Sequence, residues 1–228
     1  MFGSDGNTTT LESVNSINDL GVTVDSELSF GAHICDKINK AYQMIGVINR
    51  NFNNIDIKSF VLLYKCLVRS VVEYASSVWS PYKVGQIADL EKVQKRATKL
   101  IASCKKLSYK NRLIYLNLPT LKFRRARGDM IEVYKILHHL YDSDIVPALP
   151  RSTYSATRGN SLKLLHVRSH YDFKKYSFCS RVVGLWNSLP DCVVSTLSVN
   201  SFKNNLDKYW ANEEMYFNWK VDLTGSNM

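Results

Sequence analysis

Acidic residues are missing from one long stretch of the sequence. No Asp or Glu occurs between Lys92 and Arg127, although the whole chain carries 30 Lys and Arg against 20 Asp and Glu and a net charge of +10. A folded surface of one sign concentrates polyanions, most commonly nucleic acid. A solvated helix face that happens to be basic is the alternative, and charge alone does not separate the two. The cations are Lys92, Lys95, Arg96, Lys99, Lys105, Lys106, Lys110, Arg112, Lys122, Arg124, Arg125 and Arg127.

Long apolar runs and a targeting signal are also missing. No run approaches the length needed to span a bilayer, and the start MFGSDGNTTT lacks the basic and then apolar pattern of a signal peptide. We therefore expect no membrane partner and an intracellular protein, nuclear or cytoplasmic. The five cysteines are odd in number and widely spaced, which favours reduced thiols over a disulfide framework.

Catalytic motifs are absent. The sequence has no P-loop, GxGxxG, GxSxG or HExxH pattern. A polymerase or metal-dependent nuclease needs carboxylates held close together, whereas Asp142 and Asp144 lie in a polar linker and Glu213-Glu214 in a terminal tail. We predict no catalytic residue, no cofactor and no enzymatic activity of the chain on its own.

A zinc site is the one metal site worth weighing. His166, His170, Cys179 and Cys192 could supply four ligands. Their spacing lacks a CxxC knuckle, and Cys179 lies among core-like residues. We prefer satisfied or exposed histidines, and we predict no metal site.

Hydrophobic periodicity predicts a mainly α fold, a thumb-like helical bundle with one or two short strand pairs and a small C-terminal α+β extension. Residues 1–18 have no period, so we expect a frayed N-terminus. The alternation of Leu20, Val22 and Val24 then predicts a short strand, with Asp25-Ser26 as the turn. From Gly31 a helical stripe runs to residues 49–54.

The stretch from Lys58 to Trp79 is apolar on most of its circumference. Its polar positions form one narrow line: Lys58, Lys65, Arg69, Glu73 and Ser76. A helix of this kind is normally surrounded by other elements. We expect it to be the hub of the core, ending before Pro81.

The helix predicted from Gln86 to about Ile101 has a thin apolar stripe, and its other faces carry cations. A short helix capped by Ser108 and a long one from Thr120 to Leu140 should follow. Arg125 has Asp129 one turn on, so we predict a local ion pair. Arg124 and Arg127 have no acidic residue three or four positions away, which makes them better candidates for phosphate contacts.

The predicted organisation has five parts: 1–18, the thumb-like domain 19–140, a linker 141–157, the extension 158–210 and a tail 211–228. Within the extension we expect a short strand from Ser161 to Val167 and a helix from Asp172 to Leu189. A last helix should be capped by Ser198.

A second basic group lies in the extension: Arg158, Lys163, Arg168, Lys174, Lys175 and Arg181. It is interleaved with Tyr171, Phe173 and Tyr176, and aromatic side chains among cations can stack on unpaired bases. The alternative is that Phe173 and Tyr176 face the core, which we prefer for Phe173. The predicted nucleic-acid-binding residues are Lys92, Lys95, Arg96, Lys99, Lys105, Lys106, Arg124, Arg127, Lys174 and Lys175.

Seven segments, in order, resemble the region that follows the catalytic domain in reverse transcriptases of non-LTR retrotransposons of the jockey-like LINE type. They are DLGVTVDSELSFGAHI (19–34), LVRSVVEYASSVWSPY (67–82), LEKVQKRATKLI (90–101), LSYKNRLIYLNLPTLKFRRARGDMIEVYKIL (107–137), RGNSLKL (158–164), FCSRVVGLWNSLP (178–190) and SVNSFKNNLDKYW (198–210).

The resemblance implies a helical thumb and extension that grip template and primer while a separate palm domain synthesises DNA. The palm with its paired aspartates is absent from this sequence, so we expect a catalytically inactive fragment that binds RNA, an RNA–DNA hybrid or DNA with little sequence preference. The alternatives are a decayed element copy with no selected function and a helical protein-interaction module. Such a module could dock onto a palm domain through an exposed aromatic tail of Trp210, Tyr216, Phe217 and Trp219.

Overall fold

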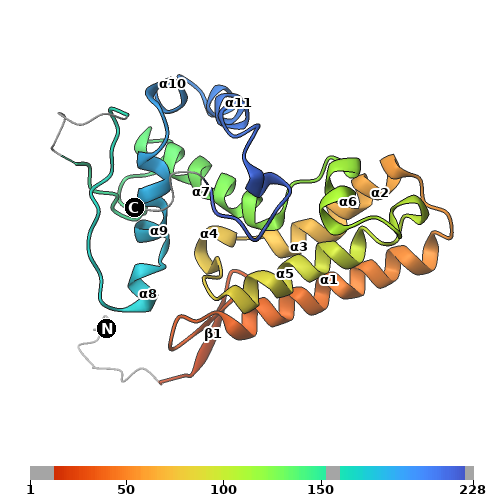
Figure 1. Cartoon of the computed structure of the whole chain (residues 1–228). Helices are drawn as coiled ribbons and strands as arrows, with labels where there is room; N and C mark the ends of the chain where they lie inside the picture. The colour runs from red at the N-terminus through yellow and green to blue at the C-terminus, as the bar shows by residue number, and fades with distance from the viewer. Residues whose placement is uncertain (1–12, 153–159, 224–228) are drawn as a thin grey trace.

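The computed structural model describes residues 13–152 and 160–223. The described chain is mainly α with one short β pair, as the sequence predicts (Figure 1). The elements are β1 (Ser16–Asp19), β2 (Val22–Asp25), α1 (Gly31–Asn51), α2 (Ile57–Leu63), the π-helix η1 (Tyr64–Arg69), α3 (Ser70–Glu73), α4 (Ser76–Trp79), α5 (Val84–Ala97), η2 (Ala102–Cys104), α6 (Tyr109–Leu116), α7 (Leu121–Leu137), α8 (Asp172–Lys175), α9 (Phe178–Asn187), α10 (Asp191–Val194), α11 (Val199–Tyr209) and η3 (Glu214–Tyr216).

The strands β1 and β2 form an antiparallel hairpin in which Asp19 pairs with Val22. Its turn is Leu20-Gly21, both at positive φ, as a tight hairpin turn requires. The predicted frayed end is therefore wrong for residues 16–18. The predicted turn at Asp25-Ser26 is confirmed, because the Leu28 backbone N–H donates to the Asp25 carbonyl oxygen at 2.9 Å. The Asp25 side chain also accepts backbone N–H bonds from Ser29 and Phe30 ahead of α1.

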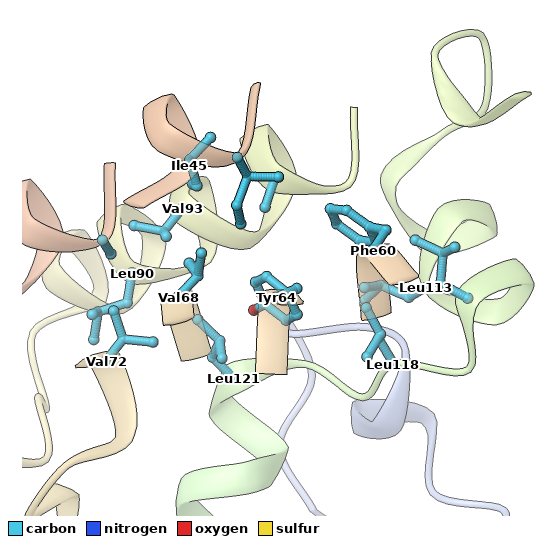
Figure 2. Close-up of a cluster of buried hydrophobic side chains, with 14 of the residues drawn as sticks. Ile45, Phe60, Tyr64, Val68, Val72, Leu90, Val93, Leu113, Leu118 and Leu121 are labelled. Atoms are coloured by element: carbon cyan, nitrogen blue, oxygen red, sulfur yellow. The ribbon is translucent and has the colours of Figure 1, made fainter. Parts of the chain in front are cut away.

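The first core is built around the stretch that the sequence marks as a hub. Figure 2 shows its buried row of Phe60, Tyr64, Val68 and Val72 among side chains of α1, α5 and α6. A strict spacing of four drifts around an α-helix of about 3.6 residues per turn. The wider turn of η1 compensates for that drift and keeps the row on one side.

The hub is not enclosed on all sides, so that prediction is wrong. Leu62 is 63% exposed and Leu67 37% exposed on the outer face of α2 and η1. The predicted single helix is also interrupted at Tyr74-Ala75, where Ala75 has a φ of 51°. Hydrophobicity indicates burial, but it does not show that one side lacks a neighbouring element.

The second core joins α7 to α9, α10 and α11, at the opposite end of the molecule from α1 and α5 (Figure 1). Leu121 belongs to the first core, whereas the buried apolar side chains of α7 from Phe123 onward belong to the second. The predicted division placed all of α7 with residues 19–120. The amphipathic pattern of α7 identifies a buried face but not the elements that cover it.

The C-terminal half departs from prediction in several places. The predicted strand 161–167 is reduced to a single antiparallel bridge between Arg151 and Leu164, and the predicted helix 172–189 is divided into α8 and α9. The described part of the tail packs into the fold, since Thr120 donates hydrogen bonds to the carbonyl oxygens of Met215 and Tyr216.

Within the described ranges, no helix combines the length and the apolar character that crossing a bilayer requires.

Candidate nucleic-acid interface

The helix α5 presents the predicted cationic face. Leu90, Val93 and Ala97 are buried against the first core. Lys92 and Arg96 are exposed on the other side, and Lys99 is exposed in the turn that follows the helix. Spacings of four and three place these three residues on one face. The local pattern therefore predicted this face correctly.

Two of these cations, Lys92 and Arg96, make only weak interactions with neighbouring side chains. The Nζ atom of Lys92 lies 2.7 Å from Oδ1 of Asp89, which raises the pKa of Lys92. Both side chains are exposed, so the pair adds little stability. The guanidinium of Arg96 lies 5.1 Å from the ring centroid of Tyr42, a contact that leaves the charge uncompensated.

Lys95 has a structural role. Its Nζ atom lies 4.6 Å from the ring centroid of Trp219 and 5.3 Å from that of Tyr109. Burial lowers the pKa of this half-buried lysine. Lys95 therefore ties the C-terminal segment to α5 and is a poorer phosphate contact than its neighbours.

Lys105 and Lys106 are exposed directly after η2. Lys110 is exposed too, and its Nζ atom lies 4.0 Å from a carboxylate oxygen of Glu214. Lys99, Lys105 and Lys106 have no ion-pair partner among the residues that the structure describes. These three lysines are the most available cations of the acid-free stretch.

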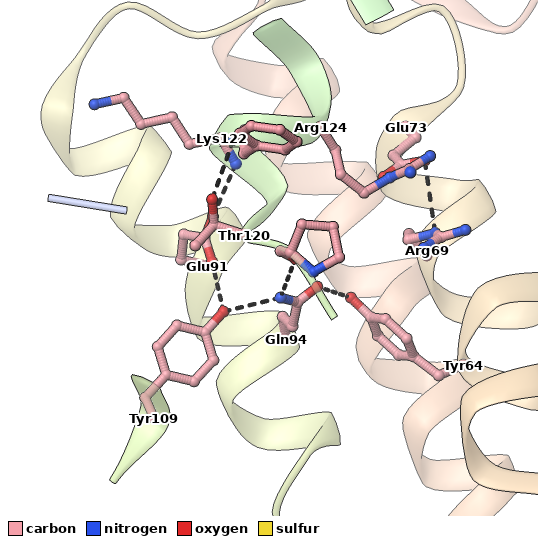
Figure 3. Close-up of polar contacts among 11 residues, drawn as sticks. Tyr64, Arg69, Glu73, Glu91, Gln94, Tyr109, Thr120, Lys122 and Arg124 are labelled. Carbon is pink, nitrogen blue, oxygen red and sulfur yellow. Dashed lines mark hydrogen bonds and ion pairs between the residues drawn. The ribbon is translucent and has the colours of Figure 1, made fainter. Parts of the chain in front are cut away.

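Arg124 and Arg127 are not free for phosphate, contrary to the prediction. Arg124 donates hydrogen bonds from Nε and Nη2 to the carboxylate of Glu73, with Nη2 2.8 Å from Oε2 (Figure 3). Arg127 donates two bonds of 2.5 and 2.7 Å to Asp207. Both partners are distant in the sequence, so a search within one helical turn could not find them.

The predicted ion pair of Arg125 with Asp129 is also replaced by a distant one. Asp129 accepts bonds of 2.9 and 3.0 Å from Arg181 of α9. Arg125 is buried beside them, and its Nη1 atom has no hydrogen-bond partner within the described residues. Burial lowers the pKa of Arg125, opposed by the charges of Glu91 and Asp129. Because Arg181 is paired with Asp129, we do not count it among the cations of the second basic group that are available to nucleic acid.

The rest of that group lies around α8. Lys174 and Lys175 are exposed. Tyr171 is 69% and Phe173 52% exposed, and their rings stack with centroids 5.8 Å apart. The preferred burial of Phe173 is therefore wrong, because α8 is a single turn without a buried face. Arg158 lies outside the described residues.

A stacked pair of tyrosines links α8 to α5. The rings of Tyr82 and Tyr176 are 4.2 Å apart and nearly parallel. Lys83 lies 5.9 Å from the Tyr82 ring and Lys175 5.2 Å from the Tyr176 ring. Lys175 of the second group and Lys83, which belongs to neither predicted group, thus flank one aromatic stack.

The sequence interpretation missed a buried polar network that holds α5 in place (Figure 3). Glu91 accepts hydrogen bonds from the Tyr109 hydroxyl and the Lys122 backbone N–H, at 2.6 and 2.9 Å. Gln94 donates to the Tyr109 hydroxyl and to the Pro119 carbonyl. Burial raises the pKa of Glu91. Glu91 and Gln94 are next to the core residues Leu90 and Val93 in the sequence, and this position on the helix was the signal that could have predicted their burial.

The four candidate zinc ligands differ in exposure. His166, His170 and Cys192 are exposed, whereas Cys179 is half-buried. Across the described ranges, no three His, Cys, Asp or Glu side chains gather as a metal site would need.

The chain is 27% identical over 142 residues to the uncharacterized protein B0403.1 of Caenorhabditis elegans, a match that covers 61% of this chain and 72% of that protein. No family model and no solved structure matches the chain. The resemblance to retrotransposon reverse transcriptases therefore rests on the seven sequence segments.

Proposed function

We propose that this chain binds the sugar-phosphate backbone of nucleic acid through the outer face of α5 and the residues after η2. The contacts are Lys92, Arg96, Lys99, Lys105 and Lys106, with Lys95 at the edge. Phosphate contacts carry no sequence information directly, so RNA, DNA and RNA–DNA hybrids are all ligands. The chain is a catalytically inactive C-terminal part of a non-LTR retrotransposon reverse transcriptase and acts inside the cell, in the nucleus or the cytoplasm.

The main support for this proposal is that the cations of the acid-free stretch fall into two sets, one held by ion pairs or hydrogen bonds within the fold and one exposed. Arg124 and Arg127 form tertiary ion pairs, and Arg112 is buried with hydrogen bonds to Thr98 and the Leu107 carbonyl oxygen. Lys92 and Arg96 of α5 and the lysines that follow the helix are exposed, and they have at most a solvent-exposed carboxylate beside them. A surplus of exposed positive charge on one side of a rigid helix is the feature that a phosphate backbone recognises.

The exposed aromatic side chains of α8 supply a second contact for unpaired bases. Tyr171 and Phe173 offer ring faces beside Lys174 and Lys175. Stacking of a base on such a ring contributes about 1 to 3 kcal/mol. Single-stranded segments should therefore extend from the α5 surface toward α8, past the Tyr82–Tyr176 stack.

Charge reversal on α5 tests the proposal. Replacing Arg96 and Lys99 by Glu should weaken binding of a fluorescently labelled RNA–DNA hybrid by on the order of tenfold or more. The matched control replaces Lys58 and Lys208 by Glu, which changes the net charge equally at exposed positions of α2 and α11. If both double variants weaken binding equally, the loss of affinity comes from the change in net charge, and the proposed surface on α5 is contradicted.

Docking onto a palm domain is a second candidate function, favoured by the outer face of α2 and η1. Leu62 and Leu67 are exposed there, whereas Trp210 of the suggested aromatic tail is only 1% exposed. Replacing Leu62 and Leu67 by Asp should abolish capture of a palm domain without changing affinity for the hybrid. Retained capture would argue against this surface.

A further inference from the structure

A cleft of about 590 Å³ opens beside the N-terminal half of α7, where η1, α11 and the C-terminal segment meet. Figure 1 shows α7 and α11, two of the elements whose residues line the cleft. The charged side chains that line it are Lys65, Arg69, Arg124, Arg127 and Asp207. Phe123, Tyr216 and Phe217 supply an aromatic wall.

The cleft has more positive than negative charge. Asp207 is paired with Arg127, and the Glu73 carboxylate at the edge is paired with Arg124. Arg69 reaches the same Glu73 carboxylate only at 3.7 Å. Lys65 is exposed and has no ion-pair partner among the described side chains. Two carboxylates therefore face four cations, and Arg69 and Lys65 supply the surplus.

The charge of Arg69 is partly buried and lies near that of Arg124, so an added anion would stabilise it. Burial lowers its pKa, and so does the nearby charge of Arg124, while Glu73 opposes both effects. Two guanidinium groups thus share one carboxylate at the border of a concave surface. An anion placed between Arg69 and Lys65 would complete their charge-assisted hydrogen bonds.

We propose that this cleft binds the terminal phosphate of a nucleotide, with the phosphate on Arg69 and Lys65 and the nucleoside against the aromatic wall. A terminal phosphate carries a charge of about −1.5 to −2 at neutral pH, which matches the surplus. A phosphodiester inside a strand carries only one negative charge. The volume lies within the range of about 300 to 1,000 Å³ usual for small-ligand sites. This site does not depend on the α5 surface.

Calorimetric titration of the full chain with AMP and with adenosine tests the site. AMP should bind at least about tenfold more tightly than adenosine, and K65Q and R69Q should each weaken AMP binding by about tenfold. K58Q, an exposed lysine of the neighbouring α2 that does not line the cleft, is the matched control. Lys65 is exposed, so K65Q should fold normally. Equal binding of AMP and adenosine, or AMP binding unaffected by K65Q, would overturn the site.

A second arm separates the two sources of a terminal phosphate. Short single strands with and without a 5′-phosphate are compared in wild-type and K65Q chains. A preference for the phosphorylated strand that K65Q removes supports the site and assigns it a strand end. Binding of AMP without that preference supports a free mononucleotide. If the wild-type chain shows neither AMP binding nor a preference for the 5′-phosphorylated strand, the site is overturned. Hybrid binding by the Arg96 and Lys99 double variant tests only the α5 surface.

Discussion

Arg124 donates two hydrogen bonds to Glu73, which lies 51 residues earlier in the chain. This ion pair joins the start of α7 to the end of α3 and therefore links an arginine among second-core residues to the hub of the first core. Arg127, one turn further along α7, joins Asp207 of α11. The arginines of α7 thus fix the arrangement of the helices.

Breaking the pair between Arg124 and Glu73 should destabilise the fold. We expect E73A and R124A each to lower the free energy of unfolding by about 2 to 3 kcal/mol, because each leaves a partly buried charge without its hydrogen-bonded partner. In a double-mutant cycle followed by urea denaturation, the coupling should be about 1 to 3 kcal/mol. The exposed pair of Lys40 and Asp36 is the control, with an expected coupling of about 0.5 kcal/mol or less. Additive single mutations at Arg124 and Glu73 would contradict a structural ion pair.

Asp129 should be among the most sensitive charged positions. It is the carboxylate that faces Arg181 and lies near buried Arg125. Its removal in D129A should cost about 3 to 5 kcal/mol, because Arg181 then lacks its ion-pair partner and buried Arg125 loses one of the two carboxylates that act on it. D144A, in an exposed loop, should change stability by no more than about 0.5 kcal/mol. A cost below about 1 kcal/mol for D129A in thermal or urea unfolding would contradict the buried cluster.

The C-terminal segment should contribute to stability. Trp210 packs edge-on against Phe123 in the second core, so W210A should lower the free energy of unfolding by about 3 to 5 kcal/mol. The adjacent Tyr209 is 48% exposed, and Y209A should cost about 1 kcal/mol or less. Similar small effects of both substitutions in urea unfolding would indicate that the segment is only loosely attached.

Asp25 should make stability depend on pH in the acid range. Burial acts to raise the pKa of its carboxyl, but hydrogen bonds from Ser29, Phe30 and Glu27 outweigh it and lower the pKa below the ordinary 3.8. Its contribution is therefore present above the unfolded pKa and is lost as the pH falls through the lower folded pKa. D25N should cost about 1 kcal/mol at pH 7, and this difference from the wild type should shrink below about pH 4. A pH-independent difference in urea unfolding would contradict the assignment.

Local chemistry explains what the sequence could predict. Ser108, Thr120 and Ser198 each accept a backbone N–H bond at the start of a helix, as predicted from residue type and position. The cationic face of α5 could be predicted for the same reason, because the two sides of an amphipathic helix are defined within the helix itself. Fold class and this part of the site follow from such patterns.

Tertiary partners explain what the sequence could not predict. The availability of Arg124 and Arg127 depends on carboxylates contributed by α3 and α11, which no helical periodicity places nearby. The burial of Glu91 depends likewise on Tyr109 of α6 and the N-terminus of α7. The outer face of η1 is exposed because no element covers it within the described structure, a fact that hydrophobicity does not reveal.

The salt dependence of binding to an RNA–DNA hybrid tests the central claim most directly. The logarithm of the affinity should fall linearly with the logarithm of the salt concentration, by roughly 0.7 to 0.9 for each neutralised phosphate. The K92E/R96E/K99E variant should flatten this slope by about 2 to 3, whereas the K58E/K208E control should leave it nearly unchanged. Binding without salt dependence, or a slope that the triple variant does not alter, would contradict a phosphate-binding surface on α5.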